Sequence, residues 1–178
     1  MTQHKISARD CVFKELIKKD VYNFLFTNHI QDPIVGKHNY GLFYENELVQ
    51  LISLSKPRYN KNFDYELIRS CSKLNTVVVG GFNKLIKNLP IQGSLISYVD
   101  RRYFTGNSYK NWKYIGETSP NYYYTKGYQR ESRIKYQKHK LARLFPDIHD
   151  DELTEWQIMQ LAGYDRIWDC GNFVYVKE

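Results

Sequence analysis

A short stretch in the middle of the chain decides the fold, and it reads Val77-Val78-Val79-Gly80-Gly81-Phe82-Asn83-Lys84. The valines favour a strand, the glycine pair allows a sharp turn, and residues 82–89 are helix-like up to the following proline. Glycine also lets backbone amides approach a ligand closely, and the first N–H groups of a helix carry partial positive charge. The stretch therefore predicts either a pyrophosphate cradle or a tight structural turn.

The segments around this turn predict a mixed sheet. The strands that we expect before it cover residues 11–17, 40–44, 48–55 and 63–74, and an amphipathic helix covers residues 18–29. Residues 76–79 lead into the turn, and residues 95–99 form a further buried strand. The fold class is thus α/β, or α+β, with helices flanking a mostly antiparallel sheet of about six or seven strands. We expect the sheet to splay near the strands that end at Val79 and Val99.

The C-terminal part of the chain differs from the rest in composition and in expected secondary structure. We expect an aromatic strand at residues 122–125, a basic helix at 126–145, a short helix at 153–159 stopped by Gly163, and an aromatic strand at 164–175. Too few residues remain there for a separate core. We therefore divide the chain into a domain at residues 1–125 and an appendage of helices and strand at 126–178, packed on that same domain.

Composition excludes several classes of protein. The chain has 178 residues, of which 42% are hydrophobic and 25% charged, as is usual for a globular protein. It contains no apolar run of membrane-spanning length, and residues 1–10 lack the apolar core of a signal peptide. We expect a cytoplasmic protein that does not bind membranes. The three cysteines are far apart and have no metal-ligand spacing, so we infer no metal site.

Charge is unevenly distributed. The formal net charge is +7, and residues 126–145 hold seven basic residues against one acid. Such a run favours polyanionic partners, although a solvated helix face is the alternative. Interleaved aromatics, among them Tyr128, Tyr136 and His139 after Tyr122-Tyr123-Tyr124, could stack on bases and favour nucleic acid, with DNA preferred. The candidate nucleic-acid contacts are Arg101, Arg102, Lys126, Arg130, Arg133, Lys135, Lys138, Lys140 and Arg143.

A second candidate site follows the strand at residues 95–99. The strand delivers Asp100 at its end, and Tyr109 and Trp112 follow shortly after. Strand ends beside a sheet opening are common places for sites, and an acid with a phenol could serve as general base and general acid in acyl transfer. The alternatives are a loop cap for Asp100, paired with Arg101 or Arg102, and core packing for the two aromatics.

These segments together resemble a known family. The residues that carry the resemblance are Tyr40-Gly41-Leu42-Phe43, Glu66-Leu67-Ile68-Arg69, the glycine turn, Ser97-Tyr98-Val99-Asp100 with Gly106, Tyr109 and Trp112, and the ending Gly163-Tyr164-Asp165-Arg166-Ile167-Trp168-Asp169-Cys170-Gly171-Asn172. The chain resembles the GNAT-like (N-acetyltransferase-like) domain that follows a Vsr-like nuclease in phage homing endonucleases. More distantly, it is similar to the Mom DNA-modification proteins of phages, which act on adenine.

The resemblance implies a GNAT-like fold and a set of site residues. Arg69, Asp100 and Tyr109 match polar residues of the Mom-type site. Gly80 and Gly81 match the turn that binds the pyrophosphate of acetyl-CoA or another acyl-CoA, and their neighbours Val79, Asn83 and Lys84 complete the candidate cofactor site. Phe82 stands at an outer position of that glycine frame, where a ring that filled the cleft would crowd the phosphates. A phage protein would work in the host cytoplasm, within a larger phage complex.

Two functions therefore stay open. The chain is either a nucleic-acid-binding module that kept the fold, or an acyl-CoA-dependent transferase in which Asp100 deprotonates an amine and Tyr109 protonates the leaving thiolate. Mom-like modification of a DNA base is a variant of the second function.

Overall fold

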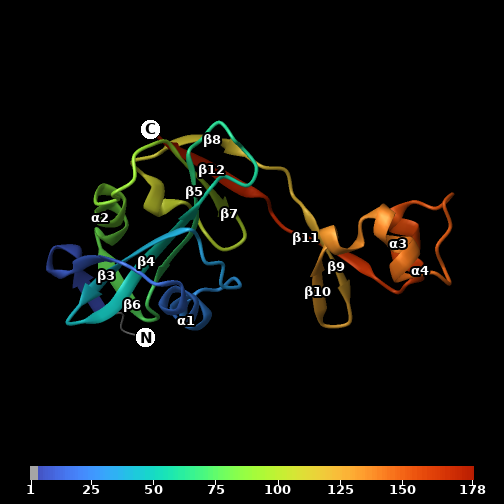
Figure 1. The fold of residues 1–178 in the computed structure, drawn as a ribbon, viewed down its shortest axis with the longest axis horizontal. Helices are drawn as coiled ribbons and strands as arrows, with labels where there is room; N and C mark the ends of the chain where they lie inside the picture. Colours follow the sequence, from blue (N-terminus) through green and yellow to red (C-terminus); the bar gives the residue numbers. More distant parts are fainter. Residues whose placement is uncertain (1–3) are drawn as a thin grey trace. The chain divides into compact units, whose positions relative to one another are not determined.

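The computed structural model describes residues 4–178 and shows two compact units (Figure 1). Unit 1 comprises the described residues up to 99 together with 105–116 and 173–178, and unit 2 comprises 100–104 and 117–172. The fold is mixed α+β with a mostly antiparallel sheet, as expected. The first three residues of the predicted domain 1–125 lie outside the described part of the chain.

Unit 1 is built on a seven-stranded sheet. Strands β2 to β5 pair antiparallel in sequence order, and β5 pairs parallel with β7. In spatial order the strands are β2 (Val12–Glu15), β3 (His38–Tyr44), β4 (Glu47–Ser55), β5 (Tyr65–Ser72), β7 (Leu95–Asp100), β12 (Asn172–Lys177) and β8 (Lys113–Glu117). The predicted hairpin of residues 40–55 is confirmed, and both residues of its turn, Glu45 and Asn46, have positive φ.

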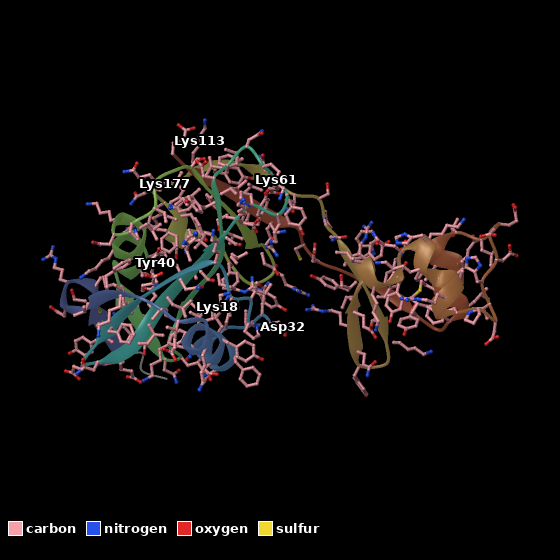
Figure 2. The ribbon with its side chains drawn as sticks, in the orientation of Figure 1. Lys18, Asp32, Tyr40, Lys61, Lys113 and Lys177 are labelled. Atoms are coloured by element: carbon pink, nitrogen blue, oxygen red, sulfur yellow. The ribbon has the colours of Figure 1, made fainter. Side chains whose placement is uncertain are left out.

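Two helices cover this sheet. Helix α1 (Lys18–Asn28) buries Val21 and Leu25, the face that the sequence predicts. Helix α2 (Gly81–Lys87) follows the glycine turn and lies against β3 and β4. In unit 1, Tyr40 of β3, labelled in Figure 2, stacks on Phe13 of β2 with ring centroids 5.4 Å apart. The predicted helix after the turn is therefore present and abuts the sheet.

A second, two-stranded sheet holds the strand that leads into the glycine turn. Strand β1 (His4–Ser7) pairs parallel with β6 (Thr76–Val79), and the short 3-10 turn η1 (Ala8–Asp10) follows β1. The prediction that β6 belongs to the main sheet, with a splay beside Val79, is wrong. Asn75 has φ 57°, and this turn directs the chain away from β5 toward the edge that β1 offers.

The parallel pair β5 and β7 is short. Its register runs from Tyr65 opposite Leu95 to Leu67 opposite Ser97, although β5 continues to Ser72 and β7 to Asp100. The 3-10 turn η2 (Asn107–Tyr109) brings Tyr109 to this place, where its hydroxyl and the Ser97 hydroxyl lie 2.8 Å apart.

Unit 2 has a three-stranded antiparallel sheet in the order β10 (Gln129–Ser132), β9 (Tyr122–Lys126) and β11 (Asp165–Trp168). The 3-10 turn η3 (Arg133–Tyr136) and helices α3 (Lys138–Leu144) and α4 (Glu155–Leu161) complete it. Thr154 and Gln157 form a capping box at the start of α4. The core of unit 2 consists of Tyr122, Tyr124, Tyr136, Leu141, Ile158 and Met159.

The predicted basic helix at residues 126–145 is wrong over its first half. Gly127 has φ 59° and forms a two-residue hairpin loop with Tyr128, so β10 folds back on β9. Ser132 then caps η3 by accepting the Ile134 N–H, and α3 begins only at Lys138. The glycine turn interrupts the helical pattern that the charge run suggested.

The single aromatic strand predicted at residues 164–175 is also wrong. Two strands, β11 and β12, occupy this range, and they belong to different sheets. Gly171 separates them with φ 70°, and a Cβ there would lie 2.2 Å from the Thr118 carbonyl oxygen. The Asp169 carboxylate accepts hydrogen bonds from the N–H groups of Asn121 and Gly171 and stabilises this turn between the two strands.

No helix within residues 4–178 has the length and apolar character required to cross a lipid bilayer.

Candidate nucleic-acid interface

Strand β9 separates the two faces of the unit 2 sheet. Tyr122 and Tyr124 point into the core with α3 and α4, whereas Tyr123 and Thr125 alternate with them and are only half-buried. On the outer side, Ser132 lies opposite Tyr123, and Arg130 lies opposite Thr125. One face of this sheet therefore packs the helices, and the other carries polar side chains.

Two arginines of the basic segment lie on tyrosine rings. The Arg130 guanidinium carbon is 4.6 Å from the centroid of the Tyr123 ring, and that of Arg133 is 4.8 Å from the Tyr122 ring. Arg133 also donates to the Asn121 side-chain oxygen at 3.3 Å. Since stacking uses only the faces of a guanidinium, the N–H edges of Arg130 remain available to a phosphate or a base.

The lysines of the segment have intramolecular partners. Lys126 donates to the Ala162 carbonyl at 2.8 Å, Lys138 to that of Asp151 at 2.9 Å, and Lys140 to that of Ile134 at 2.6 Å. Lys135 forms an ion pair with Glu131. Within the described chain, Arg143 is exposed on α3 and makes no ion pair or hydrogen bond through its side chain. The arginines are therefore the better candidates for contacts with an external polyanion.

Arg101 and Arg102 lie in unit 2 just after β7. Arg101 forms an ion pair with Glu117, and Arg102 lies over the Tyr103 ring at 4.6 Å. The Asp100 carboxylate accepts the Arg102 N–H at 2.9 Å. Asp100 thus makes the loop-capping contact that was the alternative to a catalytic role.

Several of the aromatic residues predicted to stack on bases are buried in the protein core instead. Tyr122, Tyr124 and Tyr136 are buried in the core of unit 2. Their hydroxyls bond to carboxylates: Tyr122 and Tyr124 donate to Glu155, and Tyr136 donates to Glu131. In contrast, Tyr128 is fully exposed at the hairpin tip, and His139 is exposed on α3.

Sequence reasoning missed the role of Arg166. This residue of β11 lies opposite Tyr124, and its guanidinium carbon is 4.2 Å from the Tyr122 ring centroid and 4.4 Å from that of Trp156. It also donates to the Tyr124 hydroxyl at 3.3 Å. The alternation of Tyr122 and Tyr124 could have indicated the inner face, but the pairing with a strand far along the chain gave no local signal.

The glycine turn has structural reasons for both glycines. Gly80 has φ 76° and begins α2. Gly81 is buried against Gln50, and a Cβ there would lie 1.9 Å from the Gln50 side-chain oxygen. That oxygen has no hydrogen-bond partner among the described residues. Backbone geometry and packing thus explain the turn without a ligand.

The residues beside the glycine turn differ in their exposure and in their hydrogen bonds. Lys84 is engaged, because its ammonium donates to the carbonyls of Ala8 and Cys11 at 2.8 and 2.7 Å. Val79 is exposed, and the Asn83 side-chain oxygen accepts a long hydrogen bond of 3.5 Å from the Asn111 amide. Lys84 therefore ties α2 to the N-terminal turn instead of reaching toward a phosphate.

The Phe82 ring points into the core of unit 1. Its centroid lies 5.0 Å from that of Tyr109 and 6.1 Å from that of Trp112. It does not fill a space beside the glycine turn, so the ring itself would not obstruct a cofactor at this position.

Tyr109 is held inside the same cluster. Its ring stacks on Tyr175 with centroids 4.9 Å apart, and its hydroxyl pairs with Ser97. Burial raises the pKa of Tyr109 to about 12, against the smaller opposing effect of the Ser97 hydrogen bond. The phenol is thus a weaker acid than usual, which does not favour a role as the donor of a proton to a thiolate.

Each of the three residues matched to the Mom-type site has hydrogen-bond partners. Arg69 of β5 donates to the carbonyls of Ile68 and Asp32, while Tyr109 bonds to Ser97 and Asp100 to Arg102. No group of three His, Cys, Asp or Glu side chains within residues 4–178 could hold a metal ion.

Comparison with protein-family models gives no match for this chain, and comparison with curated proteins gives none either.

Proposed function

We propose that this protein binds nucleic acid, with DNA the preferred partner, through the basic residues Arg130, Arg133 and Arg143 of unit 2. The observation that carries the proposal is the placement of Arg130 and Arg133 on the tyrosine rings of β9. A guanidinium that a ring already holds loses less conformational freedom when it binds a phosphate. The exposed Arg143 adds charge on α3.

The salt dependence of binding tests this proposal. Each cation that neutralises a phosphate releases counterions, so changing Arg130, Arg133 and Arg143 together to Glu should weaken binding to any duplex. The log-log slope against salt should become shallower by about 0.9 for each phosphate that the variant no longer neutralises. Fluorescence anisotropy with a labelled mixed-sequence duplex measures both effects.

A matched control changes the same charge in unit 1. Lys18, Lys19 and Lys37 are exposed there, and their change to Glu alters the net charge equally. We expect this variant to keep most of the affinity and the slope. Equal weakening of both variants would mean that net charge, and no surface of unit 2, governs binding.

The second candidate function is acyl transfer from acetyl-CoA or another acyl-CoA, including Mom-like modification of a DNA base. The direction of Phe82 favours it, because the ring packs on Tyr109 in the core of unit 1 instead of crowding a cofactor at the Gly80–Gly81 turn. Calorimetry with acetyl-CoA on the wild type and on Phe82→Ala tests it. Binding by the wild type would support the transferase, and binding by neither protein would reject it.

A further inference from the structure

The β9–β10 ribbon has a surface that the helices of unit 2 leave uncovered. We call it the ribbon face, and it consists of Tyr123, Thr125, Arg130 and Ser132. Helices α3 and α4 pack against the opposite face, where Tyr122 and Tyr124 join Leu141 and Ile158 in the core. The ribbon ends in the Gly127–Tyr128 loop, and no atom lies within 4 Å of where a Gly127 Cβ would stand. The ribbon therefore projects into open space at its tip.

Charge on this ribbon is positive on its outer side. Arg130 lies on the Tyr123 ring and has no hydrogen bond or ion pair in the described chain, so its N–H edges are available. The one carboxylate of β10, Glu131, points to the other face and pairs with Lys135 and Tyr136. Asp165 of β11 lies opposite Thr125 and therefore on the same face of the sheet, with β9 between it and Arg130. The positive surface thus lies toward the edge strand β10.

The dimensions of the ribbon fit one groove of duplex DNA. The ribbon belongs to a three-stranded sheet, because β11 pairs with β9 over residues 122–125, and adjacent strands lie about 4.8 Å apart. Three strands at that spacing are narrower than a major groove, which is about 12 Å wide, and wider than a minor groove of about 6 Å. Arginine is also the side chain that most often contacts guanine in the major groove, through the two donors of its guanidinium edge.

A single strand fits this surface less well. Proteins that bind single strands offer several rings on which successive bases stack. Here the Tyr123 ring is already covered by Arg130, and Tyr122, Tyr124 and Tyr136 belong to the core, which leaves only Tyr128 exposed among the tyrosines of this part of the described chain.

We infer that the ribbon face enters the major groove of duplex DNA, where Arg130 contacts the edge of a guanine. The inference rests on the proposed function and adds to it the groove and the residue that reads it. Thr125 and Ser132 flank Arg130 and Tyr123 on the same face, and Tyr128 contacts the DNA beyond the hairpin tip.

The test uses the full chain, a fluorescein-labelled mixed-sequence duplex and two competitors. Methyl green binds the major groove, and netropsin binds the minor groove. We expect methyl green to displace the protein and netropsin to leave it bound. Arg130→Gln should weaken binding about tenfold, the effect of losing one good bidentate contact. Arg130→Lys keeps the charge, so the salt dependence of binding should not change. A lysine cannot make the bidentate contact, however, so this variant should also bind almost tenfold more weakly than the wild type.

Arg9→Gln is the matched control, because it removes the same charge from an exposed position of unit 1. We expect its affinity to stay within about twofold of the wild type, since a surface substitution away from the contact has little effect. Far-UV circular dichroism of all variants checks that they fold.

Several results would overturn the inference while leaving nucleic-acid binding intact. These are displacement by netropsin instead of methyl green, stronger competition by the unlabelled single strand than by the duplex, and an Arg130→Gln variant that binds as well as Arg9→Gln. If the wild type binds no oligonucleotide at low salt, the proposed function itself fails, and the groove assignment fails with it.

Discussion

The two units solve the problem of a stable interior in different ways. The side chains at the centre of unit 1 are mostly aliphatic, and Leu42, Leu51, Ile52 and Leu54 are fully inaccessible to solvent. Unit 2 buries tyrosines, whose hydroxyls must bond to carboxylates inside the protein. An aliphatic core needs only to be filled, whereas an aromatic core of this kind also depends on hydrogen bonds and charge.

The largest effect should come from a cavity in unit 1. Leu54→Ala removes a side chain that is fully buried on the interior strand β4 and should cost about 2–5 kcal/mol in free energy of unfolding. Hydrogen exchange read by mass spectrometry should show the loss of protection in peptides of unit 1.

Leu74→Ala provides the control for that experiment, because Leu74 is 58% exposed in the same unit. It should cost less than about 0.5 kcal/mol. Similar losses for the two variants would contradict an aliphatic core centred on β4.

A smaller effect should follow from removing one hydroxyl in unit 2. Tyr124→Phe keeps the ring but loses the bond to Glu155 at 2.7 Å and the one from Arg166 at 3.3 Å. The loss should be about 1–3 kcal/mol, because these are hydrogen bonds to charged groups. Chemical denaturation measures it, with the exposed Tyr128→Phe as the control. A variant as stable as wild type would mean that shape alone maintains this core.

The smallest expected effect is a dependence on acid that differs in origin between the units. Hydrogen bonds from Lys135 and Tyr136 hold the pKa of Glu131 below its usual 4.5, and those from the Ser94 backbone and side chain hold the pKa of Asp64 below 3.8. A lowered pKa stabilises the fold above the pKa of the unfolded state, and this contribution is lost as the pH falls through the lowered value.

Glu131→Gln should therefore flatten the acid dependence of unit 2, and Asp64→Asn that of unit 1. Thermal melts between neutral and acidic pH, followed by hydrogen exchange in each unit, measure the change. If the pH profile of Glu131→Gln is the same as that of the wild type, the Glu131 carboxylate does not contribute to the stability of the aromatic core.

Local signals in the sequence predicted much of unit 1 and less of unit 2. Helix α1 and the hairpin at residues 38–55 depend on periodicity and turn residues that lie within a few positions of one another. The pairing of β6 with β1 and of β9 with β11 depends on partners far away in the chain. The run of basic residues at 126–145 suggested one continuous helix. The prediction gave no weight to a single glycine, Gly127, which reverses the direction of the chain.

The candidate site follows the same rule. The sequence identified Arg130 and Arg133 as candidate contacts but could not show that their neighbours Tyr123 and Tyr122 hold them. It also selected lysines that the structure engages with backbone carbonyls, because a carbonyl partner is not encoded by any residue type.

The position of β12 between β7 and β8 has a consequence for synthesis on the ribosome. Strands β7 and β8 emerge early, but the strand that joins them follows only after every residue of unit 2 has been made. The N-terminal part of the sheet therefore waits with an open edge while unit 2 is translated, and unpaired edges are prone to wrong pairing. The speed at which residues 117–172 are translated and folded sets how long a chaperone would need to protect that edge.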